Sequence, residues 1–374
     1  MSQAPVDVPN PQPSESADDE EMPRVVITRR RALLFGVFVL AAIAFLYYGL
    51  PKLAGLGKTW KRLGEGDPIW LVVALVLECL SFAGYVILFR TVFVRDDKEH
   101  IGLRASYQIT MAGVAATRLF AAAGAGGIAL TAWALRRSGM EPRLVAVRMI
   151  AFVALLYSVY MGALVIFGLG LYFGILNGPG PFGVTVVPAV FALILWAVFV
   201  GVTLLPGDAE RRIEHWAHGS GRFARVMARA VTVPASGAEG VRTAFRLAAQ
   251  REWGLLGAVA WWGFDMATLW ACFHAYSPGD PPPTSVIVMA YFVGMLANTL
   301  PLPGGIGGVD GGMIGAFIAF DVSGGYATVA VLSYRALAFW LPTVPGAIAY
   351  FGLRRTVAGW RNERRAHKAA VARA

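Results

Sequence analysis

The segment from Asn298 to Gly312 contains two prolines and six glycines, although apolar sequence flanks it on both sides. Proline and glycine at this density cannot continue an α-helix. In lipid, backbone amides have no water to bond, so an irregular backbone is tolerated only where protein covers it or where it lines a wet cavity. If the flanks span a membrane, this segment marks the functional centre.

The composition indicates that the surroundings are a membrane. The chain has 374 residues, of which 57% are hydrophobic and only 15% are charged, whereas soluble domains are about a quarter charged. We therefore predict an all-α polytopic membrane protein. The net charge is +10, and its basic residues cluster beside apolar runs. This pattern fits the positive-inside bias and anionic lipid, and it excludes nucleic acid as the partner.

The apolar runs divide into two kinds. Six are long enough for full membrane spans, at about 33–50, 68–90, 148–173, 184–205, 252–276 and 326–353. Two others, 105–135 and 284–321, are apolar but interrupted, which predicts broken helical hairpins. The predicted break residues are Gly124, Gly126 and Gly127 in the first hairpin, and Pro301, Pro303, Gly304, Gly305, Gly307 and Gly308 in the second.

Lysine and arginine in the flanks predict the orientation. The arginines at 29–31, those of the 206–251 loop and those of the C-terminal tail place both termini in the cytoplasm of a cell (inner or plasma) membrane protein. One flank disagrees, because its basic residues fall in a loop predicted to be outside: Lys52, Lys58, Lys61 and Arg62.

With this orientation, the same order of spans and broken hairpin occurs in about 25–175 and again in 183–353. The first hairpin opens from the cytoplasm and the second from outside, which is an inverted-topology repeat with two re-entrant hairpins. Such pairs of broken helices indicate a substrate site near the membrane midplane. The alternative is a helix bundle with glycine-packed crossings, since small residues also let membrane helices approach closely.

The domain limits follow from composition. Residues 1–24 carry six acidic residues and one arginine among prolines and serines, so we predict a disordered acidic cytoplasmic tail. Residues 25–355 form the transmembrane domain. Its 206–251 linker is predicted to be an amphipathic segment on the inner leaflet. Residues 356–374 form a basic cytoplasmic tail.

Ionisable residues within spans are functional candidates, because their burial in lipid costs several kcal/mol. Five stand out: Glu78, Arg118, Asp265, Asp310 and Arg335. The arginines would attract a phosphate, whose oxygens a guanidinium can bind bidentately. The carboxylates would orient the arginines, bind a cationic head group or carry protons. The alternative is that all five form structural ion pairs.

We predict no metal and no cofactor. Cys79 and Cys272 each lie within an apolar run, where a thiol usually packs as an inert group. The five histidines show no ligand spacing, and no phosphate-binding loop sequence indicates bound nucleotide.

Two motifs resemble those of the lysylphosphatidylglycerol synthase transmembrane (flippase-like) family. One is the Asn298–Gly312 run followed by Tyr334-Arg335 and Phe339-Trp340-Leu-Pro342; the other is Thr117-Arg-Leu-Phe with the glycines up to Gly127. The resemblance covers almost all of residues 30–355 and adds Asn298 and Tyr334 to the substrate-binding candidates. The chain departs from the family at Asp310, where glutamate is usual, and at Phe120-Ala-Ala, where Leu-Pro is usual.

The resemblance implies a lipid flippase for an anionic or phosphate-bearing lipid, aminoacylated or glycosylated lipids included. Its partners would be that membrane phospholipid or lipid-linked substrate and a separate lipid-modifying enzyme. We expect no enzymatic activity, because the family's aminoacyl-transferring members need a large soluble domain that neither the linker nor the tail can hold. Two alternatives remain: a small-molecule exporter on the same fold, and a non-transporting scaffold for a lipid-modifying or glycosyl-transferring enzyme.

Overall fold

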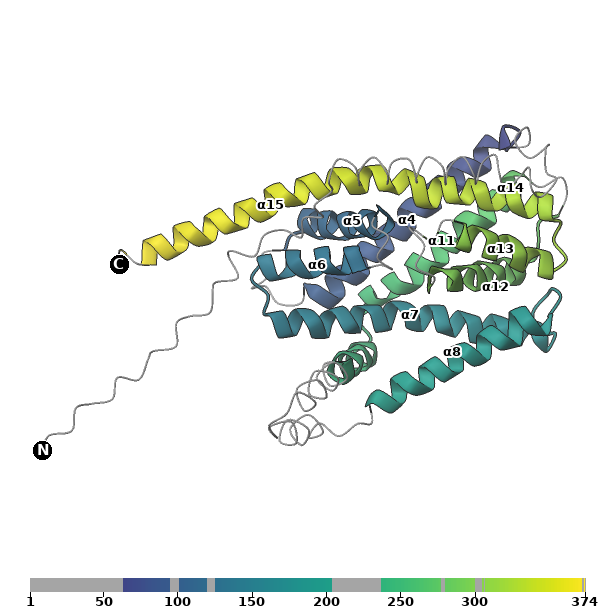
Figure 1. Ribbon diagram of the computed structural model, residues 1–374, viewed down its shortest axis with the longest axis horizontal. Coiled ribbons are helices and arrows are strands. Elements are labelled where there is room, and N and C mark those ends of the chain that lie inside the picture. The colour runs from purple at the N-terminus through teal and green to yellow at the C-terminus, as the bar shows by residue number, and fades with distance from the viewer. Residues whose placement is uncertain are drawn as a thin grey trace, which may run out of the picture.

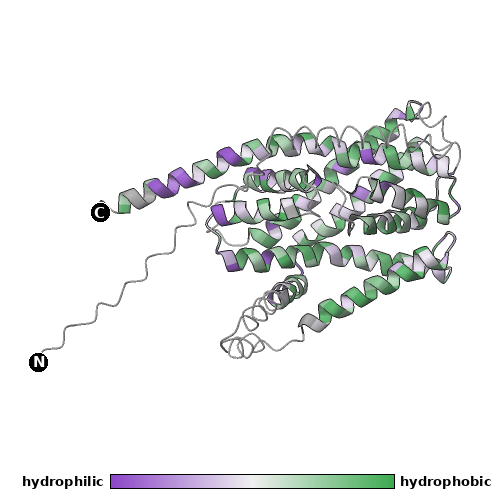
Figure 2. Cartoon of the chain, viewed as in Figure 1, coloured by the Kyte–Doolittle hydropathy of each residue, from purple (hydrophilic) through white to green (hydrophobic). Residues whose placement is uncertain are grey.

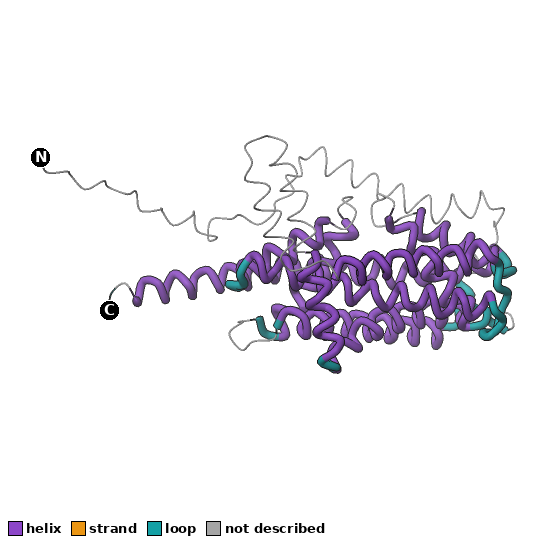
Figure 3. The backbone as a smooth tube through the Cα atoms, turned by 90° about the horizontal axis from the view of Figure 1, so that it is seen from below, coloured by secondary structure: helices purple, strands orange, loops and turns teal. Residues whose placement is uncertain are grey.

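A computed structural model describes residues 63–94, 101–119, 125–203, 237–276, 280–299, 305, 307–371 and 373 (Figure 1). Every regular element in these residues is a helix, and Figure 3 shows no strand in the described part of the chain. The predicted all-α class is therefore confirmed. The first predicted span, 33–50, and most of the 206–251 linker lie outside the described residues.

Five helical stretches of the described chain are long and apolar enough to cross a membrane. They are α4 (Pro68–Phe93), α7 (Pro142–Tyr172), α8 (Phe182–Thr203), η3 with α11 (Trp253–Leu255 and Leu256–Ala275), and the run of α14 (Gly324–Arg335), η6 (Ala336–Trp340) and α15 (Leu341–Val371). These five match the predicted second to sixth spans. Figure 2 shows apolar residues along the whole body, with hydrophilic residues gathered towards the C-terminal end of α15.

Local sequence explains where the long helices begin. Pro68 and Pro142 each stand at the first position of a helix, where the missing N–H costs nothing. Before α4, the side chain of Asp67 accepts a hydrogen bond from the Ile69 amide at 2.9 Å. The last helix runs further than predicted, because α15 continues to Val371 through much of the predicted basic tail.

The broken segments form two pairs of short helices. The first pair is α5 (Leu103–Leu119) with α6 (Ala125–Arg137); the second is α12 (Thr284–Met295), continued by the 3-10 turn η4 (Leu296–Thr299), with α13 (Gly308–Ala319). At 1.5 Å per residue these helices are about 18–26 Å long, so none alone crosses a hydrocarbon core of about 30 Å. Figure 1 shows the first pair in the half nearer the C-terminus and the second in the opposite half.

The members of each pair pack through glycine. A β-carbon on Gly127 of α6 would lie 2.5 Å from the carbonyl oxygen of Gly113 on α5. A β-carbon on Gly294 of α12 would lie 2.7 Å from the backbone nitrogen of Met313 on α13. Close backbone approach through small residues, which the bundle alternative predicted, therefore occurs inside the broken hairpins.

Helices α4 and α11 form the most extensive contact between any two elements. They cross at Gly84 and Gly257, where added β-carbons would lie 2.7 Å from Cβ of Ala260 and 2.7 Å from the backbone nitrogen of Leu88, respectively. The hydroxyl of Ser81 also donates to the Trp261 carbonyl at 2.8 Å. The pair therefore forms a tightly packed centre.

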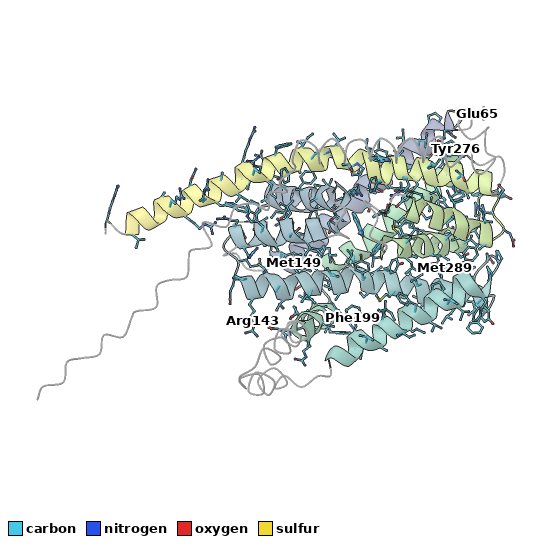
Figure 4. All side chains as sticks on the ribbon, viewed as in Figure 1. Glu65, Arg143, Met149, Phe199, Tyr276 and Met289 are labelled. Carbon is cyan, nitrogen blue, oxygen red and sulfur yellow. The ribbon has the colours of Figure 1, made fainter. Side chains whose placement is uncertain are left out.

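The two ends of the molecule differ in charge. At the end where the C-terminus lies, Arg364 of α15 donates to the carbonyl of Arg137, and Arg143 forms a 3.2 Å ion pair with Glu239. We call this the basic end. The connections at the opposite end, residues 173–181, 280–283 and 320–323, contain no lysine or arginine. Figure 4 shows Glu65 and Tyr276 at this opposite end and Arg143 near the basic end.

Candidate functional site

Asp310 and Arg335 form a buried ion pair where the second broken hairpin meets the last long helix. One carboxylate oxygen of Asp310, Oδ1, lies 2.6 Å from Nε of Arg335. The other, Oδ2, accepts a 2.8 Å hydrogen bond from the Gly307 amide. Asp310 is fully buried and Arg335 is 7% exposed. The carboxylate therefore caps the first turn of α13 and fixes the arginine against it.

The glycine connection before α13 explains how Asp310 reaches this position. Gly305 and Gly307 have φ angles of 66° and 81°, a left-handed conformation that glycine adopts without strain. The chain can therefore turn sharply and start α13 at Gly308. Asp310, three residues after the N-cap residue Gly307, then accepts a hydrogen bond from the Gly307 amide through its side chain.

The helix that carries Arg335 is irregular directly after it. Residues 336–340 form a π-helical turn, in which the Leu341 amide bonds to the Ala336 carbonyl. Pro342 has no N–H, so it cannot donate to the carbonyl of Ala338 four residues earlier. This carbonyl therefore lacks the donor that a regular α-helix would supply.

Arg118, at the end of α5, supplies that donor. Its Nη2 donates to the Ala338 carbonyl at 2.8 Å, and its Nη1 donates to the Phe339 carbonyl at 2.8 Å. The side chain is half-buried. The tip of the first broken hairpin is thereby tied to the irregular turn of the last span.

The ring of Phe339 lies close to both arginines. Cζ of Arg335 is 4.4 Å from the ring centroid and Cζ of Arg118 is 5.2 Å from it. Arginine over an aromatic face is attracted by the ring quadrupole. This attraction offsets part of the cost of holding two like charges close together in a buried place.

Two carboxyl groups complete the site from the central helix pair. Glu78 of α4 and Asp265 of α11 are 3% and 7% exposed, and the two carboxyl groups interact electrostatically with each other. Asp265 accepts from the hydroxyl of Tyr334 at 3.0 Å and from the hydroxyl of Tyr291. Both carboxyl groups also interact electrostatically with Arg118.

The structure therefore gathers the predicted charged residues into one network, which we call the buried charge cluster: Glu78, Asp265, Asp310, Arg118 and Arg335, with Tyr291 and Tyr334 as hydrogen-bond donors. Its members come from both broken hairpins and from three long helical stretches. The cluster holds three acidic and two basic side chains in a place with little access to water.

The other predicted site residues lie around this cluster or outside the described chain. Asn298 lies in η4, immediately before the break. Gly126 and Gly127 lie in the first turn of α6 rather than in the connection. The described chain does not include Gly124, Pro301, Pro303 or Gly304.

Sequence reasoning missed Tyr291 and Thr268. The hydroxyl of Thr268 donates to the Phe264 carbonyl at 2.9 Å and lies 3.3 Å from Oε2 of Glu78. Thr268 follows Asp265 by three residues, so helical spacing indicated the same face. Tyr291 is a single polar ring in an apolar run, and nothing in its local sequence distinguishes it from a packing residue.

The cysteines and the possible metal ligands of the described residues are also predicted to have no role in the site. Cys79 and Cys272 are free thiols. No group of three or more His, Cys, Asp or Glu residues in the described ranges is arranged to hold a metal ion.

Comparison with known proteins shows which family of sequences the chain matches. Residues 32–346 match the family described as lysylphosphatidylglycerol synthase TM region. A protein of Methanothermobacter thermautotrophicus (strain Delta H), described as a UPF0104 membrane protein, is 24% identical over 332 residues, which are 86% of this chain and 94% of the relative. A second match of the same description and organism is 32% identical over 106 residues, 28% of this chain and 30% of the relative.

Proposed function

Because the chain belongs to the lysylphosphatidylglycerol synthase TM region family and is an integral, multi-pass membrane protein, we propose that it moves an anionic or phosphate-bearing lipid between the two leaflets. The observation that carries this proposal is the buried charge cluster. It joins the tips of two broken hairpins, which approach from opposite ends of the molecule (Figure 1).

The position of the cluster supports transport over a purely structural role. Charged side chains inside a membrane are costly and mark ion or substrate paths. A structural tie between helices needs one pair of opposite charges, whereas this site concentrates five ionisable side chains between two hairpins and the central helices. Discontinuous helices that meet at a midplane site are typical of transporters with inverted repeats.

The two arginines give the site its preference for phosphate. A guanidinium has five N–H donors, and the bonds from Arg118 to the two carbonyls use two of them. A phosphate entering between Arg118 and Arg335 would accept hydrogen bonds from two planar groups that are already held close to Phe339. The ion pair with Asp310 would hold Arg335 in place while the site is empty.

The charge difference between the two ends supports an orientation. We assign the basic end to the cytoplasm, so that both termini are cytoplasmic and the protein lies in the cell membrane. The α5–α6 hairpin then enters from the cytoplasm and the α12–α13 hairpin from outside. Movement of the hairpins relative to the central helices would open the cluster alternately to either leaflet.

A reconstituted translocation assay tests this function. Purified protein in liposomes receives fluorescent phosphatidylglycerol or phosphatidylcholine, and a membrane-impermeant quencher reports transfer between leaflets. We expect faster transfer of the anionic lipid, loss of transfer in Arg335→Ala, and partial retention in Arg335→Lys, which keeps the charge but not the planar fork. Arg354→Ala serves as the matched control, because Arg354 is exposed on α15.

The outcomes separate the alternatives. Equal transfer by wild type, Arg335→Ala and empty liposomes would contradict lipid transport. Uptake of a soluble anion instead would indicate the small-molecule exporter. If no substrate moves, and a lipid-modifying or glycosyl-transferring enzyme co-purifies with both wild type and Arg335→Ala, the scaffold hypothesis would replace transport.

A further inference from the structure

We propose that Glu78 and Asp265 together form a proton-binding site, which takes up one proton when an anionic headgroup binds between Arg118 and Arg335. Lipid movement would then be coupled to proton movement. This inference rests on the proposed function and adds its energy source and its coupling site.

The placement of the two carboxyl groups favours a shared proton. Glu78 and Asp265 are both buried on the two central helices, and the hydroxyl of Thr268, one turn after Asp265, lies 3.3 Å from Oε2 of Glu78. A carboxylate can only accept a hydrogen bond, so two carboxyl groups can bond to each other only if one is protonated. Two buried like charges on facing helices repel each other, and a proton bound there belongs to the pair rather than to either residue.

The hydrogen bonds around the pair indicate which carboxyl group can carry this proton. Asp265 receives the hydroxyls of Tyr291 and Tyr334 on its two oxygens. Glu78 has a weaker donor beside it, because the Thr268 hydroxyl lies 3.3 Å from Oε2 of Glu78 and nearer, at 2.9 Å, to the Phe264 carbonyl oxygen. Glu78 therefore has an oxygen available to carry a proton towards Asp265.

The other charged and titratable groups that interact with the pair come from three of the neighbouring elements and from α11 itself. They are Arg118 from α5, Tyr291 from α12, Tyr334 from α14 and Cys272 from α11, whereas Arg335 interacts with Tyr334 and Asp310. The guanidinium groups and the phenols serve as hydrogen-bond donors. Asp310 pairs with Arg335 and accepts from the Gly307 amide. The Glu78–Asp265 pair is therefore the place in the cluster that takes up the proton.

Charge balance then links the proton to the substrate. With one proton on the pair, the remaining carboxylate and Asp310 balance Arg118 and Arg335, and the cluster is neutral. A phosphodiester headgroup adds one negative charge, and a net charge in a low-dielectric interior is costly. Uptake of a second proton by the pair restores neutrality, so one proton accompanies each monoanionic lipid. The only bond formed is the O–H bond of the newly protonated carboxyl group, and its proton comes from water on the side on which the lipid binds.

The first test measures lipid and proton together in the wild-type protein. Liposomes contain a trapped pH-sensitive dye and fluorescent phosphatidylglycerol, and a potassium ionophore holds the membrane potential constant. We expect internal pH to change in step with lipid transfer, and an imposed pH gradient to accelerate transfer in one direction. In Glu78→Gln and Asp265→Asn the response to the gradient should be lost, whereas Asp280→Asn, at an exposed loop position, should behave as wild type.

A second measurement does not require movement or correctly folded variants. Short-chain phosphatidylglycerol is titrated calorimetrically into the detergent-solubilised wild type, in buffers of differing ionisation enthalpy. We expect uptake of about one proton per bound lipid, as charge balance requires.

The outcomes distinguish the two proposals. Lipid that binds and moves without proton uptake would overturn the coupling and leave the transport function intact. Absence of both binding and movement would overturn the transport function and the coupling with it.

Discussion

At the residue scale, the contact that best explains the site is the hydrogen bond by which Arg118 replaces a missing helical donor to the Ala338 carbonyl. Pro342 leaves the Ala338 carbonyl without its usual helical donor, and Arg118, some 220 residues earlier in the sequence, donates to it. An unpaired buried carbonyl costs about 1–3 kcal/mol. The proline and the arginine therefore form one functional unit that ties the first hairpin to the last span.

This unit can be tested by a double-mutant cycle. Arg118→Ala should lower the apparent melting midpoint in detergent, with a cost of about 1.5–3 kcal/mol for lost charge-assisted hydrogen bonds. Pro342→Ala restores an N–H that can reach the Ala338 carbonyl, so Arg118→Ala should cost less in that background. An equal cost in both backgrounds would contradict the idea that Arg118 replaces the donor that Pro342 lacks. Arg355→Ala, at an exposed position, is the control for loss of an arginine.

The Asp310–Arg335 pair gives a second prediction at this scale. Asp310→Asn keeps an acceptor for the Gly307 amide but removes the carboxylate that pairs with Arg335, and breaking a buried ion pair by removing one partner costs about 3–5 kcal/mol. The double variant Asp310→Asn with Arg335→Gln removes that charge and should recover much of the stability, without recovering lipid transfer. Thermal denaturation and the translocation assay measure the two effects separately. If the double variant is less stable than Asp310→Asn, the charge does not cause the loss.

At the element scale, the sequence predicts more of the fold than of the site. Backbone chemistry is local, so the prolines and glycines of 298–312 predict an interrupted helix, although Gly308, Gly311 and Gly312 lie within α13. Apolar length predicts the five long helical stretches that the described chain contains. The long-range contacts leave no local signal. Neither the bond from Arg118 to Ala338 nor the choice of Tyr291 as a donor to Asp265 follows from neighbouring residues, because both depend on how distant helices are packed.

Helix packing gives the prediction that belongs to this scale. Gly257→Val should force α4 and α11 apart, since even a β-carbon would lie 2.7 Å from the Leu88 nitrogen. Overpacking of this kind costs about 1–3 kcal/mol, and the shift would also separate Glu78 from Asp265. Gly263→Val is the matched control on the same helix, because nothing lies within 4 Å of its added β-carbon. Detergent melting curves should show a lower midpoint for the first variant only; similar midpoints would contradict a tight crossing.

At the scale of the whole molecule, the two broken hairpins occupy opposite ends around a common centre. The charge cluster stands where they meet, and the central pair α4 and α11 contributes one carboxyl group from each helix. The proposed two-fold relation of the halves accounts for this arrangement, since each half would supply a span with a buried acid and a hairpin with a glycine crossing. Such a relation also requires that the two hairpins enter from opposite sides of the membrane.

The sides of the membrane can be assigned by labelling. In a Cys79→Ser background, Asp280→Cys lies between α11 and α12 at the end opposite the basic end, and Asn362→Cys lies on the exposed basic part of α15. A membrane-impermeant maleimide applied to intact cells should label the first and not the second, and permeabilised cells should label both. The physical reason is that arginine-rich flanks are retained in the cytoplasm. The reverse pattern would invert the assignment of the hairpins and the direction of proton entry. Labelling of both positions in intact cells would place the two ends on one side and contradict the inverted repeat.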